Sequence, residues 1–127
     1  MNFTSLTIVQ KIIYGLACPK THEIKYVGQC GCIEVRLPGH LAAAKRRNRL
    51  LDVWIRSIRP QVPFVVKLEV VEDRRVRING TSVSAASIAE SKWLKRFRRT
   101  VLNEDKRQCQ AYEHFINNPE LDKLLKS

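Results

Sequence analysis

Two apolar stretches near the N-terminus, separated by a short polar loop, predict a β-hairpin. Residues 9–18 (VQKIIYGLAC) and 24–29 (IKYVGQ) are rich in the β-branched and aromatic residues that favour strands, and Pro19 interrupts the pattern between them. We expect the two strands to pair antiparallel across the loop PKTHE. This pairing would let Tyr14 and Tyr26, one on each strand, face each other near one end of the hairpin.

The spacing of apolar residues then changes from strand-like to helical. From His40 to Ile58 they recur three or four positions apart, which predicts one amphipathic helix or two helices with a break near Asn48. Pro60 and Pro63 end this helical region, because proline lacks the backbone N–H that a helix interior needs. The apolar positions are Leu41, Ala44, Leu50, Leu51, Trp54, Ile55 and Ile58.

A third strand and a small basic hairpin follow. Residues 64–71 (FVVKLEVV) read as a strand, and the Asn-Gly pair at 79–80 is the signature of a type I′ turn between RRVRI and TSV. Ser84 or Ser87 is then expected to cap a helix that runs to about Arg99.

This order of elements predicts a single α/β domain spanning residues 1–127. We expect a small three-stranded, mostly antiparallel sheet flanked by helices, with the basic hairpin as an addition. The core would cover about 10–103, and a C-terminal helical extension over 104–127 would be interrupted near 118–119 (Asn-Pro). A hydrophobic content of 44% suffices for one modest core in a chain of 127 residues.

Charge narrows the choice of partner. The chain has 23 Lys and Arg against 12 Asp and Glu, a net charge of +11, which indicates a polyanionic partner, either nucleic acid or an acidic membrane surface, and we favour nucleic acid over a merely solvated basic surface. No apolar run approaches the roughly 20 residues that span a bilayer, so we expect no membrane partner. The N-terminus lacks the basic region and cleavage site of a secretory signal, so we expect an intracellular protein, in the cytoplasm or the interior of a host cell.

Four cysteines are present, and in an intracellular protein we expect them to be reduced. Cys30 and Cys32 form a C-x-C pair, which Cys18 would approach if the two flanking strands paired, so a zinc cluster is conceivable. The spacing matches none of the strong zinc patterns. We therefore favour ordinary thiols for these three residues and for Cys109.

Five residues could together carry chemistry. Tyr14 lies in IIYGL, Tyr26 in KYVGQ, and Arg36 and His40 stand four positions apart in EVRLPGH, while Glu90 follows on the helix after the third strand. In this order they resemble the GIY-YIG nuclease family. The resemblance covers about residues 10–103 and implies a β-β-α-β-α order and a metal-dependent DNA endonuclease that hydrolyses phosphodiester bonds.

The residue types suit this reaction. The carboxylate of Glu90 is a hard oxygen ligand for Mg²⁺ or Mn²⁺, and the planar guanidinium of Arg36 binds phosphate oxygens through two bonds. The resemblance implies that Tyr14 helps to activate the attacking water, with Tyr26 and His40 nearby. Whether Tyr14 or His40 accepts the proton is open at this stage, since a free tyrosine titrates near 10.

The chain departs from the family pattern in two places. Ile12 stands where the family has a glycine, and Pro38 and Gly39 lie between the arginine and the histidine. Since proline disfavours a helix interior, we expect Arg36 to reach the site from a loop and His40 from a helix N-terminus.

The remaining positive charge could bind the nucleic-acid backbone, although each basic run could equally be a solvated helix face or, in the hairpin, protection of a sheet edge. A non-catalytic basic nucleic-acid-binding module is the main alternative to the nuclease, and a zinc-stabilised interaction protein is a third. Target preference and oligomeric state, monomer or homodimer, stay open. The candidate nucleic-acid-binding residues are Lys25, Lys45, Arg46, Arg47, Arg49, Arg74, Arg75, Arg77, Lys92, Lys95, Arg96 and Asn103.

Overall fold

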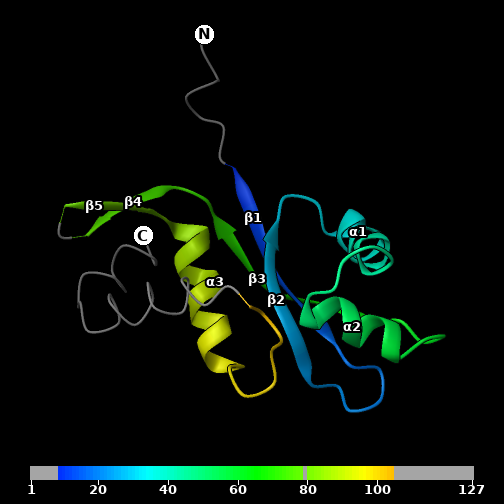
Figure 1. Ribbon diagram of the computed structural model, residues 1–127. Helices are drawn as coiled ribbons and strands as arrows, with labels where there is room; N and C mark the ends of the chain where they lie inside the picture. The colour runs from blue at the N-terminus through cyan, green and yellow to red at the C-terminus, as the bar shows by residue number, and fades with distance from the viewer. Residues whose placement is uncertain (1–8, 79, 105–127) are drawn as a thin grey trace, which may run out of the picture.

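The first apolar stretch becomes the central strand of a three-stranded antiparallel sheet. In the computed structural model, which describes residues 9–78 and 80–104, β1 (Gln10–Ala17) lies between β2 (Ile24–Cys30) and β3 (Phe64–Glu72) (Figure 1). A central strand covered on both faces has an almost continuous apolar sequence, as β1 does from residue 12 to residue 18. The three predicted strands are confirmed, each with ends within one residue of those expected.

The register of the hairpin differs from the simplest expectation. Tyr14 pairs with Gly28, and Tyr26 pairs with Leu16, so the two tyrosines are diagonal neighbours and do not stand directly opposite each other. Both side chains still lie on one face of the sheet, with ring centroids 6.1 Å apart. The pairing follows from the loop length together with a shift in register between Leu16 and Ala17.

The sheet is a layer between helices, because both of its faces are apolar (Figure 1). One face packs against α3 (Ala85–Arg96), and the other packs against α1 (Arg36–Ala44) and α2 (Leu50–Ser57). Burial of these side chains drives the layering. The α3 side buries Ile13, Ala17, Ile24, Val27, Ala89 and Leu94, and the other side buries Tyr14, Leu16, Cys30, Ala44, Leu51 and Ile55.

The helical region after β2 is two helices, with the break at residues 45–49, close to the expected position. Arg56 of α2 stabilises this break, because its Nη1 donates to the carbonyls of Ala44 (2.6 Å) and Arg47 (2.7 Å). A guanidinium at the C-terminus of α1 satisfies carbonyls that the helix leaves without a partner.

Helix α1 begins four residues before the predicted start, after a short 3-10 turn at Ile33–Val35. Pro38 is the third residue of the helix, where a backbone N–H would have no intrahelical acceptor, so the proline removes no helical bond. The expectation that Arg36 comes from a loop is therefore wrong. Arg36 and His40 lie one turn apart on α1 and share a face.

The basic hairpin is confirmed as a separate two-stranded sheet of β4 (Arg75–Ile78) and β5 (Thr81–Ser84), which extends away from the three-stranded sheet (Figure 1). Gly80 in its turn has φ of +80°, which favours glycine. Ser84 is the cap of α3, since its Oγ accepts from the backbone N–H of Ser87 (3.3 Å).

Helix α3 ends at Arg96, three residues before the predicted end, and the chain turns back along the outer edge of β2. Leu102 N donates to the carbonyl of Lys25 (2.7 Å), and the side-chain amide of Asn103 bonds both the N–H (3.1 Å) and the carbonyl (2.9 Å) of Val27. This segment covers an otherwise open sheet edge. The C-terminal helices expected from about residue 104 lie outside the described residues.

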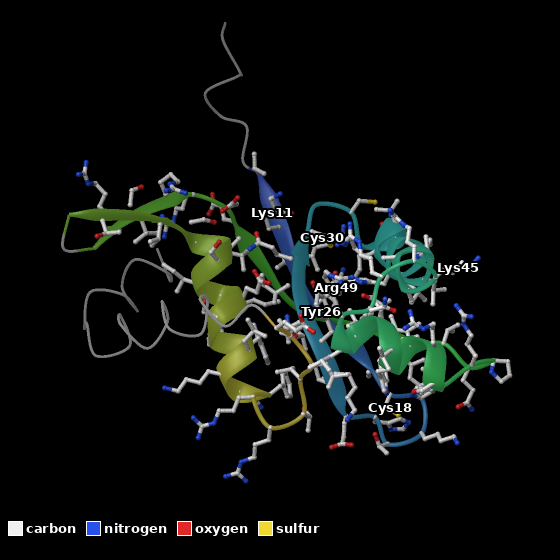
Figure 2. All side chains as sticks on the ribbon, viewed as in Figure 1. Lys11, Cys18, Tyr26, Cys30, Lys45 and Arg49 are labelled. Carbon is white, nitrogen blue, oxygen red and sulfur yellow. The ribbon has the colours of Figure 1, made fainter. Side chains whose placement is uncertain are left out.

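The paired strands separate the cysteines. Cys18 follows the end of β1, whereas Cys30 pairs with Ile12 at the opposite end of the hairpin, so the two lie about 20 Å apart at roughly 3.3 Å per residue (Figure 2). The conceivable zinc cluster of Cys18, Cys30 and Cys32 is therefore wrong. Across residues 9–78 and 80–104, no three His, Cys, Asp or Glu residues are grouped to hold a metal ion, and Cys109 lies outside the described residues.

We predict that Gly28→Ala destabilises the fold by about 1–3 kcal/mol, as overpacking does. A methyl group at this position would lie 2.8 Å from the Tyr14 hydroxyl oxygen and 2.9 Å from the ring of Tyr26, so both tyrosines would have to move. Urea unfolding measures the loss of stability.

Gly39→Ala is the matched control, because nothing lies within 4 Å of the added carbon and alanine favours α1. It should leave stability unchanged or raise it by up to about 1 kcal/mol. Equal stability of the Gly28→Ala variant and the wild type would contradict close packing of the tyrosines over Gly28.

Candidate active site

Four of the five candidate residues form one cluster between α1 and the sheet. The Tyr14 hydroxyl lies 2.7 Å from His40 Nε2 and accepts a hydrogen bond of 3.2 Å from Arg36 Nε. The Tyr26 ring lies edge-on to the imidazole of His40, with centroids 4.9 Å apart. Since α1 contributes two members and the hairpin two, the packing of this helix on the sheet assembles the cluster.

Burial determines the protonation states within the cluster. Burial raises the pKa of Tyr14 well above its usual value, despite the opposing hydrogen bond from Arg36, so the phenol is neutral. Burial also lowers the pKa of His40, to about 4, with further contributions from Arg36 and Arg49. The neutral phenol of Tyr14 and the uncharged imidazole of His40 share a hydrogen bond, in which Tyr14 is the donor when the imidazole carries its proton on Nδ1.

Tyr26 is the tyrosine of the cluster that meets solvent, whereas Tyr14 is fully buried. Two adjoining pockets share Tyr26 and Arg49 in their walls. We call one the arginine pocket; its other polar lining residues are Arg36, His40, Arg46 and Arg47. We call the second the glutamate pocket; its other polar lining residues are Glu90, Asn103 and Glu104.

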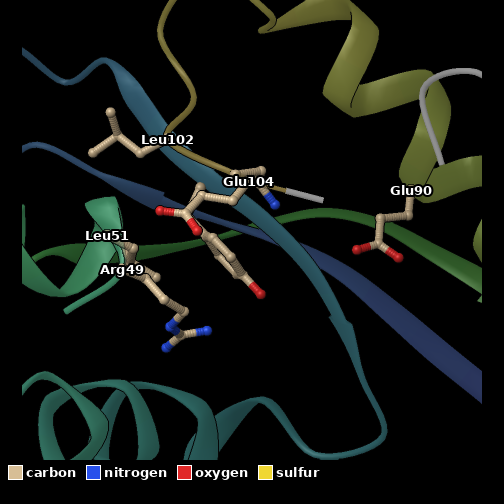
Figure 3. Close-up of a pocket in the computed structure, with 7 residues that line it drawn as sticks. Arg49, Leu51, Glu90, Leu102 and Glu104 are labelled. Atoms are coloured by element: carbon tan, nitrogen blue, oxygen red, sulfur yellow. The ribbon is translucent and has the colours of Figure 1, made fainter. Parts of the chain in front are cut away.

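Glu90 reaches this region from the opposite layer. It lies on α3, which packs on the other face of the sheet, yet its carboxylate lines the glutamate pocket at the edge of β2, across from Arg49 (Figure 3). Gln29 of β2 fixes its position, since Nε2 of the glutamine donates to Oε2 of Glu90 (2.7 Å). The negative charge of Glu90, added to burial, raises the pKa of Tyr26.

The glutamate pocket fits a hydrated divalent cation. Its volume of about 300 Å³ exceeds that of several waters, at about 30 Å³ each. Glu90 supplies a hard carboxylate oxygen, and Mg²⁺ typically binds to proteins through one or two carboxylates while keeping several waters. Glu104 adds a second carboxylate to the lining, on the side of Arg49 and Leu51 and across from Glu90 (Figure 3), and its Oε1 accepts from the backbone N–H of Leu50 (2.9 Å).

The structure separates the other candidate nucleic-acid-binding residues from this cluster, apart from Arg46, Arg47 and Arg49. Lys45 lines a different, mainly apolar pocket beside Pro60 and lies toward the outer side of the α1–α2 layer (Figure 2). The amide of Asn103 bonds the β2 backbone, although the residue lines the glutamate pocket. The remaining ones are Lys25 in β2, Arg74, Arg75 and Arg77 in or beside the hairpin, and Lys92, Lys95 and Arg96 on α3.

Several of these basic side chains have structural contacts. Lys25 lies 3.9 Å from the carboxylate of Glu23, and Lys92 forms an ion pair of 2.6 Å with Glu69. Arg96 stacks over the ring of Trp93. Exposed pairs of this kind contribute little stability, and they leave donors to bind an anion.

Sequence reasoning missed three residues that shape the site: Gln29, Asp52 and Glu104. Asp52 is fully buried and binds Arg49, the residue three positions before it. An isolated acid in the strongly basic stretch 45–59 was the available signal. Gln29 and Glu104 carried no comparable signal, because their roles depend on contacts with α3 and with the N-terminus of α2.

Comparison with protein-family models, with curated proteins and with solved structures yields no match. Within the described residues, no helix has the length and apolar character needed to cross a membrane.

We predict that Arg36→Met raises the pKa of His40 from about 4 toward 6.5, because a nearby positive charge is removed while the imidazole stays buried. NMR titration of the imidazole protons measures the change, and the signal is assigned by its loss in His40→Gln. An unchanged pKa would show that Arg36 does not act on the histidine.

The lowered pKa of His40 in the wild-type protein also makes its stability depend on pH. The pKa of His40 is lower in the folded state than in the unfolded state, so between pH 6.5 and about 4 the unfolded state binds more protons. Stability therefore falls as the pH is lowered through this window. The His40→Gln variant should lose that part of the pH dependence in urea unfolding.

Proposed function

We propose that this chain is a metal-dependent DNA endonuclease of the GIY-YIG type, which hydrolyses phosphodiester bonds. The observation that carries the proposal is the Tyr14 hydroxyl, held between His40 Nε2 and Arg36 Nε beside a pocket that contains Glu90. Four of the five residues that carried the resemblance form this cluster, and Glu90 lines a pocket that adjoins it at Tyr26. The element order supports it as well, if α1 and α2 count as one helical unit and the β4–β5 hairpin as an addition.

The departure at Ile12 is compatible with this function. Ile12 pairs with Cys30 on one side and Val70 on the other within the regular β-ladder. A position of this kind does not require the conformational freedom of glycine. The isoleucine packs beside Tyr14 and adds apolar cover to the cluster.

Each part of the reaction has a suitable group. Arg36 and Arg49 are guanidinium groups that can bind phosphate oxygens of the substrate strand. A divalent cation held by Glu90 would supply Lewis-acid stabilisation of the phosphate and the leaving oxygen. Tyr26 lines both pockets and is therefore the hydroxyl that can contact the attacking water directly.

The hydrogen-bonded pair favours His40 as the proton acceptor. Tyr14 is neutral and its hydroxyl lies 2.7 Å from Nε2 of His40, whose imidazole is uncharged at neutral pH, so Nε2 can accept from the phenol when the ring proton is on Nδ1. Tyr14 then orients the histidine, and it can pass its proton to His40 as it takes one from the hydroxyl of Tyr26, which in turn takes one from the water, so that no phenolate is left behind. A bound phosphate would make the histidine a stronger base, because its charge offsets that of Arg36.

A non-catalytic nucleic-acid-binding module is the second candidate. The observation that favours it is the complete burial of Tyr14, which the side chains of Arg36 and His40 cover. In such a module the same cluster would only stabilise the packing of α1 on the sheet.

We predict metal-dependent nicking of supercoiled plasmid DNA by the purified protein with Mg²⁺ or Mn²⁺. Tyr14→Phe and Glu90→Gln should each lower the rate by about 100-fold or more, because each removes a group that acts on the proton or the cation. Gel assays of the nicked form measure the rates, and circular dichroism checks the fold of each variant.

Glu72→Gln is the matched control, since this exposed carboxylate lies on β3 and outside both pockets. It should nick at the wild-type rate. Binding of plasmid without cleavage at any metal concentration would reject the nuclease and leave the binding module.

We predict that the double charge reversal Arg75→Glu and Arg77→Glu weakens DNA binding without unfolding the domain. Both side chains are exposed on β4, and each lost phosphate contact should reduce the slope of log K against log salt by about 0.9. Fluorescence anisotropy across a salt series measures this, with Arg59→Glu as the control. Unchanged affinity at physiological salt would reject a role for the hairpin.

A further inference from the structure

The arginine pocket and the glutamate pocket are adjacent but chemically different. Glu90 lines only the glutamate pocket, whereas Arg36, Arg46 and Arg47 line only the arginine pocket. No acidic residue is among the described residues that line the arginine pocket. A chamber of this composition suits an anion.

Arg49 stands between the two pockets and is held there. Its Nε donates to Oδ2 of Asp52 (2.9 Å) and its Nη2 to Oδ1 (3.2 Å), and its backbone N–H also donates to Oδ2 (3.0 Å). Asp52 is fully buried. Burial acts to raise the pKa of Asp52, but the hydrogen bonds and charge of Arg49 hold it below its usual value, so the pair is ionised.

This clamp leaves part of the guanidinium for a ligand. Of the five N–H donors of an arginine side chain, the bonds to Asp52 use two. Three donors remain, on a residue that lines both pockets and whose side chain is 38% exposed. A fixed guanidinium loses little conformational entropy when it binds an anion.

The rest of the pocket wall is fixed in the same way. Arg56 binds the carbonyls of Ala44 and Arg47, and its Nη2 donates to Oδ1 of Asn48 (3.0 Å). These bonds hold the backbone of the loop that carries Arg46 and Arg47. The backbone of this loop and the Arg49 guanidinium are therefore held in place by contacts within the protein.

We propose that the arginine pocket is a second phosphate subsite, which binds the phosphate next to the one that is cut, with Arg49 as a phosphate ligand and Asp52 as its positioning residue. This inference rests on the proposed function. It implies that the substrate is one strand with at least two consecutive charged phosphates, so that an isolated phosphodiester would be a poor substrate.

The first test measures phosphate binding without any cleavage. Inorganic phosphate is titrated into the metal-free protein, and the His40 imidazole, which lines the pocket, is followed by NMR. The charged and titratable groups that act on this imidazole are Arg36, Arg49 and Asp52, and the hydroxyl-bearing rings of Tyr14 and Tyr26 contact it. A phosphate in the pocket should raise the pKa of His40, because it offsets the two guanidinium charges.

Arg49→Ala should weaken this phosphate binding by about tenfold, the loss expected for a charged hydrogen-bond donor. Arg59→Ala, an exposed arginine outside both pockets, is the control and should bind as the wild type does. No response of His40 to phosphate, or an equal response in the wild type and Arg49→Ala, would overturn the subsite.

Asp52→Asn tests the positioning role, with thermal unfolding to confirm that the variant is folded. As a single substitution, Asp52→Asn should weaken phosphate binding. Added to Arg49→Ala, it should cause no further loss. Additive losses would overturn the role of Asp52. If the asparagine variant does not fold, Arg49→Lys takes its place as the test. Lysine retains the positive charge but cannot form the two-bond contact with the Asp52 carboxylate, so this variant should also weaken phosphate binding.

The second test uses oligonucleotides in which one phosphate beside the cut is replaced by a neutral methylphosphonate. At one of the phosphates next to the cut, the methylphosphonate should raise KM more than it lowers kcat. In the Arg49→Ala variant, the same replacement should no longer raise KM. An equal penalty in both proteins would overturn the subsite. If the wild type cuts no DNA but His40 responds to phosphate through Arg49, the nuclease proposal fails and the anion subsite stands.

Discussion

The hydroxyl of Tyr14 is the point on which the arrangement of this domain depends. It lies in the apolar layer between the sheet and α1, where a polar atom without partners would cost about 1–3 kcal/mol. Arg36 and His40 provide those partners from successive turns of one helix, so satisfying the hydroxyl also sets the position of α1. Gly28 completes the fit, since its lack of a side chain makes room for the hydroxyl on the facing strand. Packing and chemistry therefore constrain the same residues.

A second constraint is the concentration of positive charge around the cluster. Burial, together with the nearby charges of Arg36 and Arg49, lowers the pKa of His40, and repulsion among the clustered guanidinium groups opposes folding unless anionic or polar groups offset it. Asp52 does so from within the core by binding Arg49, and the carbonyls at the end of α1 do so for Arg56. The outcome is a fixed array of guanidinium groups that faces solvent. Such an array suits a polyanion, in agreement with the net charge of the whole chain.

Strand β2 explains how two opposite layers can serve one site. It is an edge strand, so side chains from α3 and from the α1–α2 layer can meet around it without crossing the sheet. Glu90 reaches the edge from one layer with the help of Gln29, and Arg49 reaches it from the other. Tyr26, on the strand itself, lies between them. Residues 100–103 form hydrogen bonds with the backbone of β2 and so cover its edge. A ligand can therefore reach the two pockets beside this strand but cannot pair with the strand itself.

The local pattern of the sequence determined the three strands, the basic hairpin and the cap of α3, because β-branched runs, an Asn-Gly pair and a serine before a helix act over a few residues. The grouping of five residues rested on a family resemblance, and four of them form one cluster in the structure. Tertiary structure alone decided the diagonal placement of Tyr14 and Tyr26, the start of α1 before Pro38, and the separation of Cys18 from Cys30. Each depends on register or on a helix end, which distant contacts set. The burial of Asp52 and the neutral state of His40 likewise follow from packing between elements far apart in the chain, which no local pattern encodes.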